Sequence, residues 1–134
     1  MKYLYCDSCS LITYYQDGLL GSLSQYKGYF YISETQINGE LLYPNELGPL
    51  VRQSITVILE DREEIIEKTK ELTSSQSRLS RFDCLSLAYA ILDGYCLVTD
   101  DKALIKKCNS FGVEVKTSKQ IKEEFCLEVI GMKK

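Results

Sequence analysis

Strand-like and helix-like segments alternate along this chain, and no tight hairpin turn separates two strand-like segments. Strands joined by helices rather than by hairpins run parallel to one another. The chain is therefore expected to fold as an α/β protein with a mostly parallel central sheet, in a single domain over residues 1–134. The predicted strands are residues 2–6, 55–59, 95–99 and 113–117, and residues 29–32 form one further apolar segment.

The stretches between these segments carry apolar residues at helical spacing. Residues 8–23 have this spacing, although Gly18 and Gly21 would weaken or break a helix there. Ser80 and Asp83 have the spacing of a capping box, which predicts a helix that ends at Gly94. Residues 73–77 are polar and are expected to form a loop. The other predicted helices cover residues 34–42, 60–72, 101–111 and 119–125, with a short irregular helix near 44–49.

The chain contains no histidine, and this absence limits the chemistry that it can perform. Serine–histidine and cysteine–histidine catalysis are excluded, as is an imidazole general base. An enzyme of this composition must use carboxylates, lysines, tyrosines, thiols or a metal held by carboxylates. The net charge of −3 does not by itself indicate a nucleic-acid-binding protein.

The six cysteines are expected to be reduced thiols, most of them in the core of a cytoplasmic protein. No signal peptide and no segment long enough to span a membrane is evident in the sequence. Cys6 and Cys9 could form a redox pair or half of a zinc site. A zinc site needs about four ligands, and the remaining cysteines are widely separated singletons.

Acidic residues follow the predicted strands at the points where they end. Asp7 follows strand 2–6, and the pair Asp100 and Asp101 follows strand 95–99. The carboxyl ends of parallel strands form the edge at which such sheets bind ligands. Clustered carboxylates repel one another, so they must share protons or bind a cation, for which Mg²⁺ is the natural choice. The acids expected near this edge on helices are Glu34, Glu40 and Asp83.

Each of these acids also has a purely structural explanation. Asp7 could bond to the backbone of the turn that follows it, and Asp83 could complete the cap begun by Ser80. Asp100 could cap the helix at 101–111, with Asp101 adding a favourable charge at its N-terminus. Glu34 and Glu40 could be ordinary helix residues. Because the predicted topology brings these acids to one edge, the combined pattern favours a metal site.

Four short motifs occur in order along the chain, each preceded by the appropriate strand or helix. The motifs are Asp7-Ser8-Cys9-Ser10-Leu11-Ile12, Ile37-Asn38-Gly39-Glu40-Leu41, Leu79-Ser80-Arg81-Phe82-Asp83 and Leu97-Val98-Thr99-Asp100-Asp101. In these motifs the chain resembles the PIN-domain nucleases over roughly residues 3–125, and especially the short prokaryotic forms related to the toxins of toxin–antitoxin pairs.

The resemblance implies a three-layer α/β/α sandwich and a carboxylate cluster that binds one or two Mg²⁺ or Mn²⁺ ions. It implies hydrolysis of RNA phosphodiester bonds, a cognate antitoxin protein and a homodimer. Thr99 would orient a water or a carboxylate, and Asp100 would be an additional ligand or a cap. The implied ligands are Asp7, Glu40, Asp83 and Asp101, with Asp101 as the main ligand of its pair.

The chain departs from the family pattern at two places. Cys9 stands where the family often has asparagine, and Glu34 competes with Glu40 as the second acid. The first departure leaves open a second hypothesis, a catalytically impaired module that binds RNA or a protein partner.

Basic residues near the predicted site are candidates for RNA contacts. Removal of the four site acids from the 19 acidic residues leaves 15, against 16 basic residues, so the remaining surface is close to neutral. Arg78, Arg81 and Lys102 flank the predicted site and could contact phosphates. Their alternative role is ordinary solvated surface.

Overall fold

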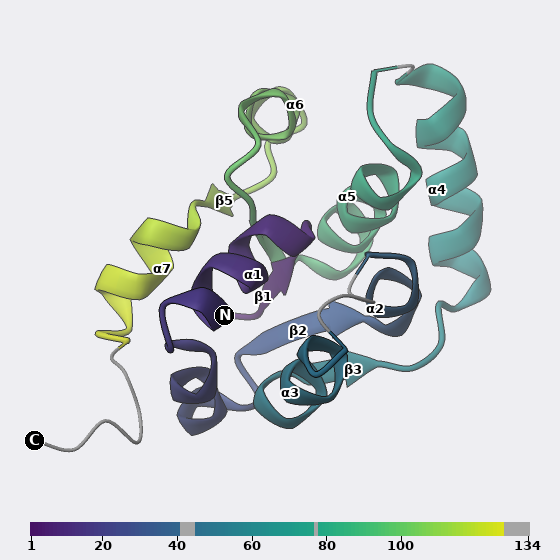
Figure 1. Ribbon diagram of the computed structural model, residues 1–134. Coiled ribbons are helices and arrows are strands. Elements are labelled where there is room, and N and C mark those ends of the chain that lie inside the picture. Colours follow the sequence, from purple (N-terminus) through teal and green to yellow (C-terminus); the bar gives the residue numbers. More distant parts are fainter. Residues whose placement is uncertain (41–44, 77, 128–134) are drawn as a thin grey trace, which may run out of the picture.

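The computed structural model describes residues 1–40, 45–76 and 78–127, and it contains a five-stranded parallel sheet (Figure 1). The strand order is β3-β2-β1-β4-β5, and every neighbouring pair is parallel. The α/β prediction is therefore confirmed, and the apolar segment at 29–32 contributes a strand. The strands are β1 (Tyr3–Tyr5), β2 (Phe30–Ser33), β3 (Thr56–Ile58), β4 (Cys96–Val98) and β5 (Val115–Lys116).

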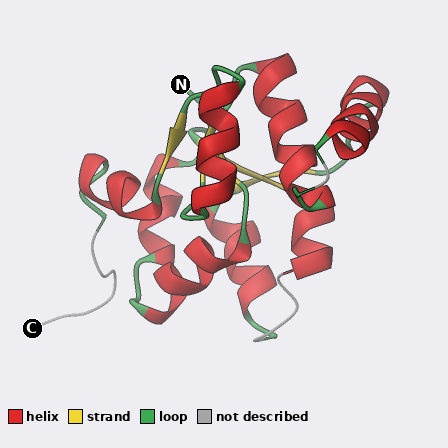
Figure 2. Cartoon of the chain, turned by 90° about the horizontal axis from the view of Figure 1, so that it is seen from above, coloured by secondary structure: helices red, strands yellow, loops and turns green. Residues whose placement is uncertain are grey.

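Helices cover both faces of the sheet and complete a three-layer sandwich (Figures 1 and 2). Residues of α1, η1, α3 and α7 pack in one core, whereas residues of α4, α5 and α6 pack in the other. The helices are α1 (Ser8–Gln16), the 3₁₀ helix η1 (Leu20–Tyr26), α2 (Glu34–Glu40), α3 (Leu47–Ser54), α4 (Glu63–Ser75), α5 (Arg81–Asp93), α6 (Lys102–Ser110) and α7 (Ser118–Glu124).

The central strand β1 shows why the strand segments are apolar throughout. Successive side chains of a strand point to opposite faces of the sheet. Tyr3 and Tyr5 accordingly pack in the core beneath α1, and Leu4 and Cys6 pack in the core beneath α5. A strand buried on both faces has no position for a polar residue, so the first polar side chain after β1, that of Asp7, stands at the sheet edge.

Several predicted element boundaries are wrong by a few residues. The helical pattern at 8–23 is divided, because α1 ends at Gln16 and Gly18 takes a left-handed backbone conformation (φ 73°) before η1 begins. The predicted loop at 73–77 begins late, because α4 continues to Ser75. The helix predicted near 44–49 runs from Leu47 to Ser54, and residues 41–44 and 77 lie outside the described part of the chain.

No helix among the described residues has the length and apolar composition needed to cross a membrane.

Candidate functional site

Four aspartates mark the carboxyl edge of β1 and β4. Asp7 follows β1, Asp100 and Asp101 follow β4, and Asp83 lies in the first turn of α5. Each of them accepts a hydrogen bond from a backbone N–H at or next to a helix N-terminus. The N-termini of α1, α5, α6 and α7 therefore point their positive dipole ends at this edge, which partly offsets the negative charge.

Asp7 is the N-cap of α1 and is also bonded to β4. Its Oδ1 accepts a hydrogen bond from the backbone N–H of Ser10 at 3.1 Å, which confirms the predicted local bond. Its Oδ2 accepts a hydrogen bond of 2.6 Å from the Thr99 hydroxyl. The orienting contact predicted for Thr99 is present, and it links the ends of the two central strands.

Asp100 does not have the capping role predicted for it. Its Oδ1 accepts from the backbone N–H of Ser118 at 2.8 Å, and its Oδ2 accepts from the Ser118 hydroxyl at 2.6 Å, both at the start of α7. The Ser10 hydroxyl lies 3.2 Å from Asp7 Oδ1 and 3.4 Å from Asp100 Oδ2, so one hydroxyl links the two carboxylates. Sequence reasoning missed Ser118 because its contact depends on α7 folding back beside β4.

Asp101, and not Asp100, caps α6. Its Oδ1 accepts from the backbone N–H groups of Ala103 at 2.8 Å and Leu104 at 3.2 Å. Its own backbone N–H donates to the Thr99 hydroxyl oxygen at 3.1 Å. Among the described residues nothing donates a hydrogen bond to Asp101 Oδ2, which leaves that oxygen available to a ligand.

Asp83 forms the predicted capping box with Ser80 at the start of α5. Burial raises the pKa of the Asp83 carboxyl, and the negative charges of Asp101 and Asp7 raise it further against the lowering effect of the Ser80 hydrogen bonds. The negative charges of Asp7 and Asp101 therefore act on Asp83, which is a neighbour of both.

The two glutamates have different surroundings. Glu34 forms an ion pair of 2.9 Å with Arg52 of α3. Glu40 is the last residue of α2, and its side chain lies outside the described part of the structure. The side-chain amide of Gln36 donates to the backbone carbonyl of Cys6, which fixes α2 against the end of β1.

Within the described chain, none of the four aspartates forms an ion pair with a basic side chain.

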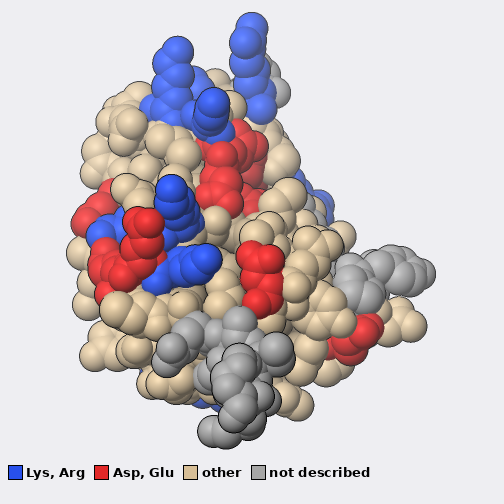
Figure 3. All heavy atoms as spheres, turned by 60° about the vertical axis from the view of Figure 1, so that its left-hand side comes forward, with Lys and Arg blue, Asp and Glu red and all other residues tan. Residues whose placement is uncertain are grey.

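The predicted RNA-contact residues lie on different parts of the surface. A cavity of about 520 Å³ between the start of α5 and α6 is lined by Arg78, Lys106 and Lys107. Lys102 is exposed, and Arg81 lies over the Phe82 ring at 5.8 Å, beside a different cavity. Figure 3 shows basic side chains projecting above a group of acidic ones on the face that it presents.

The donor chemistry of this edge suits a hard divalent cation, but the aspartates do not form a closed cage. Among the described side chains, no group of three or more His, Cys, Asp or Glu residues is close enough to hold a metal ion. Mg²⁺ commonly keeps several waters and uses only one or two carboxylates. No hydrogen bond to Asp83 Oδ1 or Asp101 Oδ2 is present among the described residues, which leaves each oxygen free to accept a bond from a water of such an ion.

Comparison with known proteins gives a likeness of fold. No family model matches the chain, and no curated protein matches it at a significant level. Among solved structures, the chain is similar to the crystal structure of PAE2754 from Pyrobaculum aerophilum, with a TM-score of 0.66 and 16% sequence identity. The match covers 94% of this chain and 96% of that one. At this identity the likeness shows that the two chains share the α/β/α architecture.

Proposed function

We propose that this protein is a metal-dependent endoribonuclease of the PIN-domain type. Its active site would be the carboxylate cluster at the edge of β1 and β4. The observation that carries the proposal is the placement of Asp7, Asp83 and Asp101 at one sheet edge, where Asp7 and Asp101 raise the pKa of Asp83 and no described basic residue forms an ion pair with any of the three. Carboxylates gathered in this way share protons or bind a cation, and we propose the cation. The motif resemblance supplies RNA as the substrate and a cognate antitoxin and a second copy as partners.

Some residues of the site would bind the metal ion, and others would orient the ligands and the ion-bound water. Asp83 and Asp101 would hold Mg²⁺ or Mn²⁺ through the oxygens that the described chain leaves unbonded. Asp7, fixed by Thr99 and Ser10, would bind an ion-bound water or the ion itself. When bound, the ion would generate a nucleophile from water at neutral pH and neutralise charge on the phosphate.

The second acid of the site is proposed to be Glu40. Glu34 is occupied by its ion pair with Arg52, whereas the motif resemblance gives Glu40 the ligand position. Cleavage should therefore fall in Glu40→Gln and stay near the wild-type rate in Glu34→Gln.

The test separates capping from metal binding by replacing aspartate with asparagine, which is an equally good N-cap but a much weaker ligand. The wild-type protein should cleave RNA with Mn²⁺ or Mg²⁺ and stop with chelator. Removal of groups that merely support metal ligands costs about 10- to 100-fold. Asp7→Asn, Asp83→Asn and Asp101→Asn should therefore lose more than about 100-fold in cleavage rate while remaining folded.

The control is the exposed Asp17→Asn variant at the far end of α1, which should cleave like the wild type. Metal binding is measured separately as a rise in melting temperature with Mn²⁺, because a ligand that binds only the folded state stabilises it. Equal cleavage by the wild type and all three site variants would overturn the proposal. An absence of Mn²⁺ stabilisation and cleavage in the folded wild type would favour a non-catalytic binding module.

A further inference from the structure

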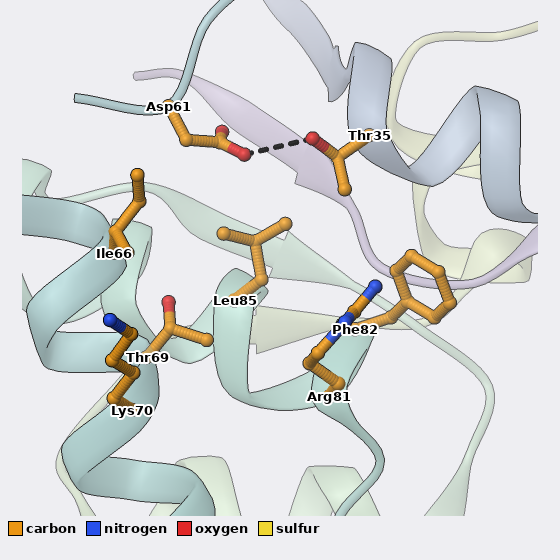
Figure 4. A pocket seen from close by; sticks show the side chains of 8 residues that line it. All are labelled: Thr35, Asp61, Ile66, Thr69, Lys70, Arg81, Phe82 and Leu85. Atoms are coloured by element: carbon orange, nitrogen blue, oxygen red, sulfur yellow. Dashed lines mark hydrogen bonds between the residues drawn. The ribbon is translucent and has the colours of Figure 1, made fainter. Parts of the chain in front are cut away.

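A second cavity lies at the same sheet edge, between α2, α4 and α5 (Figure 4). Its volume is about 260 Å³. Ile66, Phe82 and Leu85 supply an apolar lining, and Asp61, Lys70 and Arg81 supply charges. Drug-sized ligands occupy about 300–1,000 Å³, so this cavity suits a smaller, single-ring or double-ring molecule.

Asp61 is held in place at the rim of this cavity by three hydroxyl groups. Its Oδ2 accepts from the Thr35 hydroxyl at 2.9 Å, and its Oδ1 accepts from Ser33 at 3.5 Å and from the Tyr89 hydroxyl. Burial, together with the bond to Asp61, raises the pKa of Tyr89, which keeps that hydroxyl a donor. An ionised carboxylate has about four acceptor positions. One position on Oδ2 therefore remains for a ligand.

The opposite side of the cavity is positively charged. Lys70 and Arg81 are exposed, and neither forms an ion pair with any residue that the structure describes. Asp61 is likewise without an ion pair in the described chain. In Figure 4, the Asp61 carboxylate and these two basic side chains come from different sides of the cavity. A matching ligand carries an N–H donor at one end and a negative charge at the other.

We propose that this cavity binds one unpaired RNA base that bears an exocyclic amino group. The amino group would donate to Asp61, the ring would contact Phe82, and the attached phosphate would lie near Lys70 and Arg81. Base stacking on aromatic side chains and salt-dependent phosphate contacts are the usual means of binding single strands. The choice of RNA as the ligand rests on the proposed ribonuclease function.

The position of the cavity relative to the acid cluster supports this assignment. Phe82 lines the cavity, and the next residue of α5, Asp83, is a neighbour of Asp7 and Asp101. Successive residues of a helix are rotated by about 100°. The first turn of α5 therefore directs Phe82 into the cavity and Asp83 toward the acid cluster. A base bound in the cavity would hold a neighbouring phosphate beside the carboxylates.

This arrangement predicts discrimination between cytosine and uracil. Cytosine presents an amino group where uracil presents a carbonyl oxygen. The oxygen would face the Asp61 carboxylate, which can only accept hydrogen bonds when ionised. One hydrogen bond to a charged group corresponds to about 10-fold or more in affinity. Cytidine monophosphate should therefore bind at least about 10-fold more tightly than uridine monophosphate.

The test measures binding of the two mononucleotides to the full chain by NMR chemical-shift perturbation, without added metal. Asp61→Asn keeps an acceptor oxygen for Tyr89 and Ser33 and places an amide N–H₂ group at the Oδ2 position that faces the ligand, so it should bring the two affinities together. Phe82→Leu should weaken both nucleotides alike. Glu60→Gln, a change of the same kind at the exposed neighbouring position, should leave the preference unchanged.

The outcomes separate this inference from the proposed ribonuclease function. Equal binding of the two nucleotides, no shift at millimolar concentration, or a preference that persists in Asp61→Asn would each overturn the inference. Metal-dependent RNA cleavage could still be found in those cases. Conversely, a cytidine preference that Asp61→Asn abolishes, in a protein that cleaves no RNA, would support the cavity and reject the nuclease.

Discussion

At the scale of the residue, the aspartates at the sheet edge stabilise helix N-termini and are also the proposed metal ligands. Asp7 and Asp101 are N-caps, and Asp83 belongs to a capping box. A cap uses one carboxylate oxygen and leaves the other free to face outward, as Asp101 shows. The structural explanation and the metal-site explanation are therefore compatible, and substitution by asparagine distinguishes between them.

Asp83→Asn should stabilise the protein when metal is absent. The folded state raises the pKa of Asp83 above its ordinary value of 3.8, so folding favours the protonated form. Well below pH 3.8 the Asp83 carboxyl is protonated in both the folded and the unfolded state, so it does not lower the free energy of unfolding. The loss of stability grows as the pH rises from 3.8 to the folded pKa and is complete above it. At pH 7 in chelator, urea unfolding should therefore show an advantage for Asp83→Asn over the wild type.

That advantage should disappear below about pH 4, because the wild-type carboxyl is then neutral. Saturating Mn²⁺ should reverse the order, since the ion stabilises only a protein that can bind it. Asp17→Asn, at an exposed position, serves as the matched control. A pH-independent difference would show that Asp83 acts through its cap alone.

At the scale of the element, the Phe82 side chain of α5 packs against α2 at the sheet edge. A Cβ atom added to Gly39 of α2 would lie 2.3 Å from Cζ of Phe82, so the absence of a side chain on Gly39 lets the Phe82 ring lie against α2. The bond from Gln36 to the carbonyl of Cys6 holds the same helix to β1. These contacts place α2 beside the first turn of α5, from which Phe82 reaches the cavity and Asp83 the acid cluster.

Gly39→Ala should therefore destabilise the protein by about 1–3 kcal/mol, the usual cost of overpacking. Phe82→Leu in the same chain should recover most of this loss, because the shorter side chain makes room for the added methyl group. The free energies of unfolding of the two single variants and the double variant give the coupling. Gly21→Ala is the control, since a Cβ atom there would meet nothing within 4 Å. Additive effects of the two changes would contradict this contact.

At the scale of the whole molecule, two separate cores lie on the two faces of one sheet. The cysteines follow this division, because Cys96 belongs to one core and Cys6, Cys84 and Cys108 belong to the other. Cys9 and Cys126 are exposed, so the prediction of core thiols holds for four of the six. Burial raises the pKa of Cys96 to about 12 and that of Cys108 to about 11.

A thiol reagent should consequently label two cysteines rapidly and four slowly. The reactive form is the thiolate, which burial suppresses and shields from the reagent. The four buried thiols should react at the rate of unfolding, and all six should react at once in denaturant. Mass spectrometry of the labelled chain, with Cys9→Ser and Cys126→Ser as controls, identifies the sites. Rapid labelling of Cys6 or Cys96 would contradict the packing of the central strands.

The predictions from sequence succeeded where a signal is local. The apolar run before Asp7 and the pair Ser80 and Asp83 predict a strand end and a cap, and both are present. Predicted boundaries failed where packing extends a helix past its local pattern, as α4 does to Ser75. Asp61 follows β3 much as Asp7 follows β1. The sequence contains that signal, but the predicted helix at 60–72 includes Asp61, whereas α4 begins only at Glu63.

The sequence by itself determined the order of strands and helices along the chain, the parallel sheet and the aspartates that follow β1 and β4, because apolar periodicity and capping act between near neighbours. The tertiary structure decided which partner each acid has. Asp100 accepts hydrogen bonds from Ser118, Glu34 pairs with Arg52, and Asp61 accepts a hydrogen bond from Tyr89. These contacts join residues 18, 18 and 28 positions apart. No local pattern encodes them, since they form only when separate helices pack on a common sheet.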